Sequence, residues 1–318
     1  MVNLRFLGMA DGELTGPIPE PLGRLRFLEV SHLSSNNGLI GPIPDSIGRL
    51  RFLEVLDISY NELTGPIPTF IGQKLSKLDL SFNQLNGLIP QSFGKLASLT
   101  YLDLQSNRLT VSIPLLIGKL YKLDLSVNRL NSSIPESLGR LVSLQEISLN
   151  SNLLSGPIPV SLGKLDRLQY LDVSNNSLEG VVSEAHFAKL STLMGLITSF
   201  NTRNLGTLLL SNTKISGPLP TWLRKTPTIH LLDLSHNKLS GLLTNLPFRR
   251  NVDTFDPNVF GVLFLVNNIF NESIPKSLCT RKDLGYLDLS KNRTTQANEV
   301  ASTVHDHLVE GQFNQLSS

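Results

Sequence analysis

Histidines are the side chains of this sequence best suited to acid–base or metal chemistry, and their spacing keeps them apart. His230 and His236 stand six residues apart, about 20 Å at the rise of an extended strand, so they cannot share one metal ion. His305 and His307 flank Asp306, but no further ligand follows nearby, and we interpret this group as a solvated turn. No nucleophile lies at a recognisable spacing from a histidine and a carboxylate. We therefore expect no catalytic residues, no metal site and no enzymatic activity.

A glycine-rich segment at residues 156–165 raises the question of phosphate binding. Its sequence, GPIPVSLGKL, contains glycines and a lysine, but too many residues separate the two glycines for a phosphate loop. Leu165 also stands where a serine or threonine must contact magnesium. We interpret the segment as structural and expect no nucleotide or other cofactor.

Composition argues against several further classes of protein. The chain has 318 residues, 17% of them charged, and a net charge of +2, which gives no basic surface for nucleic acid. The single cysteine, Cys279, rules out an internal disulfide framework. The longest apolar run, residues 260–266, is too short to span a membrane, and the first residues show no signal-peptide pattern. Leucine dominates instead, with 63 copies, far above ordinary usage.

The leucines belong to one repeated pattern, L-x-x-L-x-L-x-x-N-x-L-x-G-x-I-P-x-x-L-G-x-L, which is clearest at residues 53–68. Successive asparagines from Asn61 lie 22, 24, 21, 24 and 24 residues apart, so the period is near 24. This signature is typical of the leucine-rich repeat, whose copies stack into one solenoid. Thirteen copies are expected, with their asparagine slot at Gly12, Asn36, Asn61, Asn83, Asn107, Asn128, Asn152, Asn176, Asn201, Thr213, Asn237, Asn268 and Asn292.

Each repeated residue type has a physical role. In the L-x-L stretch alternate residues point to opposite faces of a short strand, so leucines enter the core and the x residues line the concave sheet. The asparagine amide donates and accepts at once, and stacked asparagines can satisfy the backbone where the coil turns away from the sheet. We predict an α/β solenoid with a parallel sheet on its concave face and short 3-10 turns on an irregular convex side.

The L-x-G-x-I-P-x-x-L-G segment, present at residues 14–23 and 154–163, resembles the plant-specific leucine-rich repeat. Within the array, residues 178–190 (LEGVVSEAHFAKL) resemble a repeat of plant receptor-like proteins of the ethylene-inducing-xylanase receptor type. This resemblance implies ligand recognition in defence or developmental signalling at the extracellular side of the plasma membrane. It also implies a peptide or protein ligand and a co-receptor ectodomain as partners.

Family members begin with a signal peptide and a cysteine-bearing cap, and end with a second cap and a membrane helix. The repeats of this chain begin at Leu4 without these features, so we interpret the chain as an internal ectodomain fragment or a truncated paralogue. Two alternatives stay open. One is a secreted inhibitor resembling polygalacturonase-inhibiting proteins, and the other is a truncated product without independent function.

We divide the chain into a repeat array at residues 1–292 and a divergent tail at residues 293–318. The period is expected to break at residues 201–213, where two slots lie only 12 residues apart, and at residues 241–260, where the spacing expands to 31. In the tail Val300, Val304 and Leu308 recur every four residues, which predicts a short helix over residues 299–308 that covers the last coil. A disordered tail is the competing interpretation.

Tyrosine is favoured at binding surfaces because it combines apolar area with a polar tip. We expect all five tyrosines (Tyr60, Tyr101, Tyr121, Tyr170 and Tyr286) to lie on the concave strands. Ligand contact is expected between Asn83 and Asn176, through Tyr101, Tyr121 and Tyr170, with Gln145 and Glu146 on the intervening coil. The alternative is that tyrosine is a common filler of this repeat position.

Charged residues form two further columns. One is acidic, and we favour local hydrogen bonding of its carboxylates over a site for a basic ligand; its members are Asp57, Asp79, Asp103, Asp124, Asp172, Asp233 and Asp288. The other is basic and is expected to form a solvated stripe, with an acidic partner as the alternative; it comprises Arg24, Arg49, Lys95, Lys119, Arg140 and Lys164. Glycosylation sequons occur at Asn131, Asn175, Asn271 and Asn292, and we exclude Asn292 because it occupies the inward asparagine slot.

Overall fold

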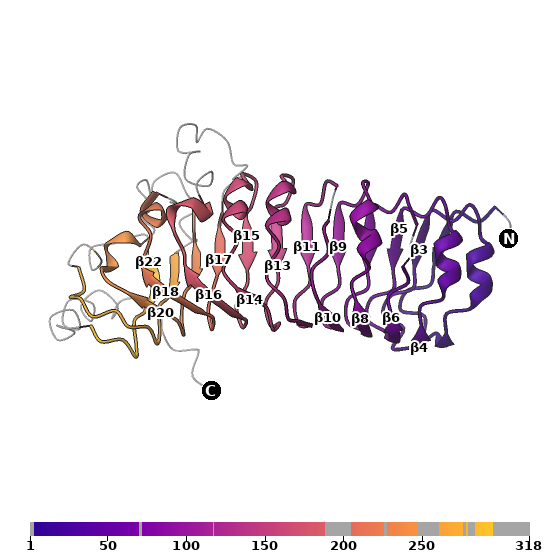
Figure 1. The fold of residues 1–318 in the computed structure, drawn as a ribbon. Coiled ribbons are helices and arrows are strands. Elements are labelled where there is room, and N and C mark those ends of the chain that lie inside the picture. Colours follow the sequence, from indigo (N-terminus) through magenta and orange to yellow (C-terminus); the bar gives the residue numbers. More distant parts are fainter. Residues whose placement is uncertain are drawn as a thin grey trace.

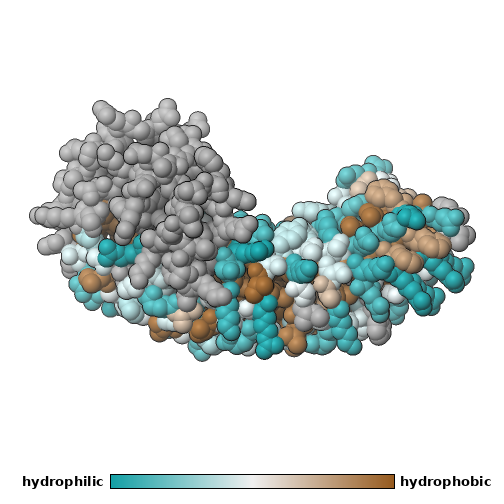
Figure 2. All heavy atoms as spheres, turned by 90° about the horizontal axis from the view of Figure 1, so that it is seen from above, coloured by the Kyte–Doolittle hydropathy of each residue, from teal (hydrophilic) through white to brown (hydrophobic). Residues whose placement is uncertain are grey.

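The computed structural model is an elongated solenoid of short strands joined by turns and 3-10 helices (Figure 1). Seen from above that view, the array has a curved outline (Figure 2). The structure describes residues 3–69, 72–116, 118–187, 205–225, 228–246, 261–275, 278 and 284–294. The predicted tail helix, His305 and His307, Cys279 and most of residues 241–260 lie outside these ranges.

Twelve parallel strands of the described residues form one large sheet, in which each strand pairs with the next coil. They are β1 (Phe6–Gly8), β3 (Val30–His32), β5 (Val55–Asp57), β7 (Lys77–Asp79), β9 (Tyr101–Asp103), β11 (Lys122–Asp124), β13 (Glu146–Ser148), β15 (Tyr170–Asp172), β17 (Thr207–Leu209), β19 (Leu231–Asp233), β21 (Gly261–Phe264) and β22 (Leu284–Asp288). The leucines of the L-x-L motif point inward; Leu102 and Leu123, for example, are fully buried. This confirms the predicted solenoid.

Two further parallel sheets follow the asparagines, where the sequence predicted only irregular structure. The x-L-x-G-P segment is extended in most coils, and stacking brings neighbouring copies into pairing distance. One sheet contains β2 (Thr15–Pro17), β4 (Gly38–Pro42), β6 (Glu62–Pro66), β8 (Gln84–Leu88), β10 (Arg108–Val111) and β12 (Arg129–Leu130). The other contains β14 (Ser155–Gly156), β16 (Ser177–Val181), β18 (Lys214–Pro218) and β20 (Lys238–Ser240).

Short 3-10 helices return the chain to the large sheet, as predicted. They are η1 (Glu20–Arg24), η2 (Asp45–Arg49), η3 (Gln91–Lys95), η4 (Glu136–Arg140), η5 (Val160–Lys164), η6 (Glu184–Phe187), η7 (Thr221–Lys225) and η8 (Leu243–Asn245). The two shortest coils, which end at Asn83 and Asn128, have no such helix in their described residues. Their period is two or three residues below 24, and the missing residues come from this return segment.

The buried asparagines form a ladder of hydrogen bonds between coils. The Asn107 amide nitrogen donates to Leu80 O of the preceding coil at 2.9 Å and to Leu104 O of its own coil at 3.2 Å. Its Oδ1 accepts from the Leu85 backbone N–H at 3.0 Å. Each amide therefore joins two coils and satisfies buried backbone groups that have no strand partner.

The ladder changes at two coils. One extra residue follows Asn36 before the next inward leucine, and Asn61 Oδ1 is buried there without a hydrogen-bond partner. Thr213 replaces asparagine in another coil, and its hydroxyl lies 2.7 Å from Asn237 Oδ1. A threonine hydroxyl cannot make all the bonds of an amide, so this coil has a weaker link to its neighbours.

The sequence predicts an irregular coil between Asn176 and Thr213. We expected Asn201 to close a separate coil, but that residue lies outside the described ranges. On either side of it β15 and β17 are direct neighbours, with Asp172 opposite Leu209. Within the described ranges no strand lies between β15 and β17, and the large sheet contains twelve strands there.

Close packing of the 3-10 helices requires glycine at one position. A Cβ atom added to Gly139 would overlap the carbonyl oxygen of Ser161 in the next coil. In contrast, a Cβ added to Gly16 would meet no atom within 4 Å. The glycine after the inward leucine thus permits adjacent return segments to approach each other.

Removing one ladder amide should destabilise the whole array. We expect Asn107→Ala to lower the free energy of unfolding by about 3 kcal/mol, since buried carbonyl and N–H groups lose their partners. Asn107→Asp keeps the acceptor but loses the donors, and it should be nearly as harmful. Denaturant unfolding measures both. The exposed Asn131→Ala is the control and should change stability by no more than about 0.5 kcal/mol.

Substituting the packed glycine should also be costly. Gly139→Ala is expected to lower stability by about 2 kcal/mol, because the added methyl group forces neighbouring coils apart. Gly16→Ala, which has open space but a positive φ of 84°, should cost only about 1 kcal/mol. Equal losses in thermal or denaturant unfolding would contradict this account of coil packing.

Candidate functional site

The register of the large sheet places one group of concave side chains side by side. Lys77, Tyr101, Lys122, Glu146 and Tyr170 occupy equivalent positions on five successive strands, β7 to β15. Strands in a sheet lie about 4.8 Å apart, so neighbours in this column can touch. We call these five residues the central column.

Two of the five tyrosines do not lie at the predicted strand position. Tyr60 lies in the turn after β5, where its φ is 52°. Tyr121 lies one residue before its strand and aligns with Thr100, because Lys122 is the residue opposite Tyr101. Tyr121 stands seven residues before Asn128, whereas Tyr101 and Tyr170 stand six residues before Asn107 and Asn176.

Tyr101 is the residue around which the central column packs. Lys77 Nζ and Lys122 Nζ lie 5.0 and 5.1 Å from the centre of its ring, close enough for cation–π interactions from both neighbouring strands. The Tyr121 ring lies 6.1 Å away at a tilt of 58°, so the shifted Tyr121 still joins the cluster. The Tyr101 hydroxyl donates to Asp103 Oδ2 at 3.2 Å.

These contacts alter the proton affinity of the tyrosines. Desolvation by burial, followed by the charge of Asp103, raises the pKa of Tyr101 above its usual value. Desolvation and the neighbouring charge of Asp172 raise the pKa of Tyr170 to about 12. Both hydroxyls are therefore protonated donors at neutral pH.

The acidic column lies next to the central column, and most of its carboxylates are hydrogen-bonded locally, as favoured from the sequence. Asp124 Oδ1 accepts from Ser126 Oγ at 2.6 Å and from the Ser126 N–H at 3.0 Å. The same aspartate–serine pair occurs at Asp57, Asp79, Asp172 and Asp233. This arrangement stabilises the turn after each strand and leaves Oδ2 directed to the sheet face.

Two lysines neutralise part of this column. Lys77 Nζ lies 3.3 Å from Asp57 Oδ2 and 3.9 Å from Asp79 Oδ2. Lys122 Nζ lies 3.3 Å from Asp103 Oδ2. Within the described residues Asp124 has no cation at this distance, although it is the next carboxylate along the sheet. Lys122 pairs with Asp103, and its charge also acts on Asp124 from a greater distance.

Burial dominates the acid–base behaviour of three of these carboxyls. Desolvation raises the pKa of Asp79, Asp103 and Asp172 above 3.8. Neighbouring carboxylates add to the shift, and hydrogen bonds from Ser81, Gln105 and Ser174 oppose it. The charged forms are therefore less stable in the folded protein than in water.

Gln145 and Glu146 lie between the two tyrosine-bearing strands, as the sequence predicted. Glu146 is exposed within the central column, and Gln145 is half-buried beside it. The backbone N–H groups of both residues donate to Tyr121 O at 2.8 and 3.0 Å. The structure thus brings Tyr101, Tyr121, Gln145, Glu146 and Tyr170 onto adjacent coils.

The basic column is a separate, exposed stripe. Arg24, Arg49, Lys95, Arg140 and Lys164 end their 3-10 helices, and all are exposed, as is Lys119. The predicted glycosylation residues Asn131, Asn175 and Asn271 are also exposed. Asn292 instead donates to Leu265 O and Leu289 O at 2.9 Å, which agrees with its exclusion as an acceptor.

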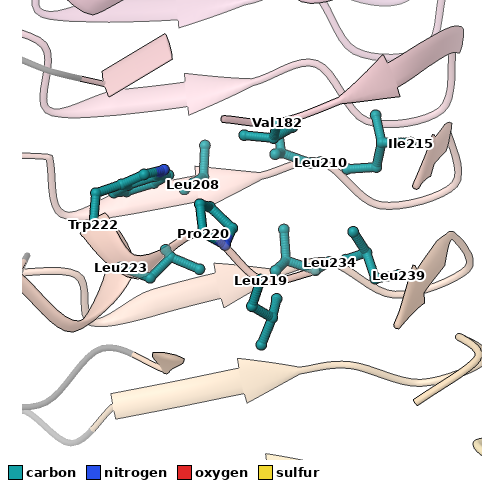
Figure 3. A pocket seen from close by; sticks show the side chains of 10 residues that line it. All are labelled: Val182, Leu208, Leu210, Ile215, Leu219, Pro220, Trp222, Leu223, Leu234 and Leu239. Carbon is teal, nitrogen blue, oxygen red and sulfur yellow. The ribbon is translucent and has the colours of Figure 1, made fainter. Parts of the chain in front are cut away.

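The other candidate positions, two histidines and one pocket, do not form a functional site. His230 and His236 lie before and after β19, and His236 Nδ1 is 3.0 Å from Asn267 Nδ2. In the described part of the chain no three His, Cys, Asp or Glu side chains are grouped to hold a metal ion. A pocket at Trp222 is lined only by apolar side chains from successive coils (Figure 3). It is a small gap in core packing between neighbouring coils.

Sequence reasoning missed one group of exposed residues, in the slot immediately before each ladder asparagine. We call this position the turn slot. Most coils have a small or polar residue there, but Tyr60, Phe82 and Val127 are bulky, and all three have a positive φ. The signal was present in the sequence as an unusual apolar residue before Asn61, Asn83 and Asn128.

Comparison with known proteins agrees with this architecture. A family profile described as leucine rich repeat matches residues 53–109 and 118–178. Receptor-like protein 7 of Arabidopsis thaliana is 39% identical over 105 residues, which cover 28% of this chain and 11% of that protein. The chain is a leucine-rich-repeat solenoid, and its repeats are similar to those of plant receptor-like proteins. The ethylene-inducing-xylanase receptor type remains a prediction.

Solved plant receptors share the fold of this solenoid. The Arabidopsis receptor kinase HAESA, in complex with an IDA peptide hormone, has a TM-score of 0.75 and 33% identity, covering 88% of this chain and 44% of its own. A HAESA complex that also contains the co-receptor SERK1 is known. The plant peptide hormone receptor RGFR1, bound to RGF2, has a TM-score of 0.72 and 27% identity, covering 92% of this chain and 52% of its own. The solenoid thus spans about half of these receptor chains. None of the described helices is long and apolar enough to cross a membrane.

The buried carboxyls generate a prediction about pH. Their pKa values in the folded protein lie above 3.8, so the folded state binds protons more tightly than the unfolded state. Their stabilising contribution is full below that pH and is lost as pH rises through the raised values. The triple variant Asp79→Asn, Asp103→Asn, Asp172→Asn should therefore lose less stability than the wild type between about pH 4 and pH 7. If the unfolding temperature of both proteins depended on pH in the same way, this result would contradict the raised pKa values.

The exposed sequons generate a second prediction. When the chain is secreted from a eukaryotic host, we expect a glycan on Asn131, because this residue is exposed and outside the asparagine ladder. Asn131→Gln should remove one glycan mass, whereas Asn292→Gln should leave the glycan mass unchanged. Intact-protein mass spectrometry measures both, and a glycan on Asn292 would contradict the ladder geometry.

Proposed function

We propose that this chain is a non-catalytic recognition module that binds a peptide on the concave face between β7 and β15. The observation that carries the proposal is the cluster around Tyr101, in which rings, cations and carboxylates from adjacent strands meet on one surface. Similarity to receptor ectodomains that hold peptide hormones supports the ligand class.

Tyr101 is the proposed anchor of this site. Lys77 and Lys122 restrain its ring on both sides, so little side-chain freedom remains to be lost on binding. Tyrosine anchors of this kind contribute a large share of binding energy at interfaces. Tyr121, which is more exposed, and Tyr170 extend the aromatic surface along the sheet.

Polar residues between the tyrosines would fix the orientation of the peptide. Gln145 and Glu146 separate Tyr121 from Tyr170. The Gln145 amide would donate to and accept from an extended peptide backbone, and the Glu146 carboxylate would accept from its N–H groups. Asp124, which has no ion pair within the described residues, favours a basic ligand residue nearby. The site is therefore built for a peptide that contains apolar and basic side chains.

The proposal also includes a cellular location for the chain and a partner protein. A receptor-like role puts the concave face on the extracellular side of the plasma membrane, in defence or developmental signalling. The co-receptor found with HAESA supports a second ectodomain as a partner for this chain as well.

Peptides selected from a random display library against the purified chain test the proposal. We expect Tyr101→Ala and Tyr121→Ala each to weaken binding of the selected peptides by about 1–3 kcal/mol, because both rings would be anchors. Isothermal titration calorimetry measures the loss. Tyr286→Ala, on the last described strand, is the matched control and should leave affinity unchanged.

Unchanged affinity in both central variants, with folding intact, would contradict the placement of the site. Selection that yields no peptide sensitive to either variant would contradict the proposed function itself.

A further inference from the structure

Three bulky side chains occupy a backbone position that disfavours them. Tyr60, Phe82 and Val127 fill the turn slot, and each has a φ of 52°. Other coils place Ser35, Ser106, Ser151 or Asn175 there, or another polar residue. Positive φ is unusual for bulky residues and is a strong outlier for β-branched valine, whereas asparagine tolerates it.

Packing does not explain these three residues. Their exposed fractions are 49% for Tyr60, 36% for Phe82 and 44% for Val127, so they contribute little to the core. Backbone strain that brings no burial is often retained at a site of function. All three belong to coils that carry the acidic column from Asp57 to Asp124.

The two aromatic residues already form a stack with one open end. The Tyr60 and Phe82 rings are 4.2 Å apart and nearly parallel, at 11°. Phe82 N–H donates to Gln105 O in the following coil, so Ser106 is its neighbour in the next turn slot. A serine side chain is too small to cover the second face of the Phe82 ring.

Beyond Ser106 the next turn slot is again bulky. Ser106 N–H donates to Ser126 O, next to Val127. Phe82 and Val127 are thus two coils apart, about 10 Å at ordinary strand spacing. Ser106 between them leaves a notch that one flat ring would fill, at the place where a third ring of the stack is missing. We call Phe82, Ser106 and Val127 the notch.

We propose that the notch binds an aromatic side chain of a peptide ligand, which stacks on the open face of Phe82. The inference rests on the proposed function for its ligand class, and it adds a specificity site at the edge of the concave face. An aromatic ring in this place continues the Tyr60–Phe82 stack and packs its other face against the Val127 methyl groups.

The carboxylate of Asp124 favours a particular type of residue next to the aromatic residue of the ligand. Asp124 lies three residues before Val127, at the end of β11, and its Oδ1 is held by Ser126. No cation of the described residues lies within ion-pair distance of its other oxygen, since Lys122 pairs with Asp103. A ligand with an arginine or lysine next to its aromatic residue could place that cation at Asp124 while the ring enters the notch.

Dipeptide probes test the notch without a known ligand. Arginyl-tryptophan amide is titrated into the nitrogen-15-labelled full chain, and backbone amide shifts are followed by NMR. We expect saturable shifts at Phe82, Ser106 and Val127, whereas arginyl-alanine amide should cause none there. Glutamyl-tryptophan amide should bind more weakly because of Asp124.

Two variants in equivalent turn slots provide a matched comparison. Ser106→Tyr fills the notch, and Tyr60 shows that the slot accepts tyrosine; affinity for arginyl-tryptophan amide should fall by at least about tenfold. Ser151→Tyr places the same side chain one coil beyond Val127 and should bind as the wild type does. Equal affinity of both variants would overturn the proposal, as would the absence of shifts at the notch.

Phe82→Asn separates a binding role from a structural one. Asparagine tolerates a positive φ, so the proposal expects the unfolding temperature to be kept while dipeptide binding is lost. A large fall in unfolding temperature, or a change in oligomeric state in analytical ultracentrifugation, would instead assign Phe82 to packing or self-association and overturn the proposal. If Tyr101→Ala abolishes binding of library-selected peptides but Ser106→Tyr does not, the proposed function stands and the notch inference fails.

Discussion

The hydrogen bonding of one asparagine amide per coil is the interaction on which the rest of this structure depends. A carboxamide donates and accepts at the same time, so each asparagine can join its own turn to the preceding coil. At Asn107 these bonds reach Leu80 O, Leu104 O and the Leu85 N–H. Leucine burial supplies most of the stabilising energy, but it is not directional. The asparagines determine how successive coils align.

Alignment of the coils creates the candidate site. Tyr101 contacts Lys77 and Lys122 only because the three residues hold the same position on adjacent strands. No single repeat contains a binding site, and the surface exists as columns that cross five or six coils. Such a surface favours an extended ligand, which meets a new side chain from the array at each strand.

The regular features of the fold could be predicted from the sequence because spacing alone determines them. Asparagine spacing near 24 residues predicted the strands, and the inward place of Asn292 followed from its slot. Local deviations were harder to predict. Tyr121 lies one residue before the strand position, and Tyr60 is a turn residue. The two additional sheets depend on pairing between coils that the pattern of one repeat does not contain.

Hydrogen–deuterium exchange with and without a library-selected peptide tests the central claim most directly. The claim is that recognition occurs on the concave face from β7 to β15. We predict slower exchange of backbone amides in the strands and following turns of residues 77–176, with little change in the 3-10 helices on the return side. Protection confined to η1 to η5 or to the sheet of β2 to β12 would contradict the account.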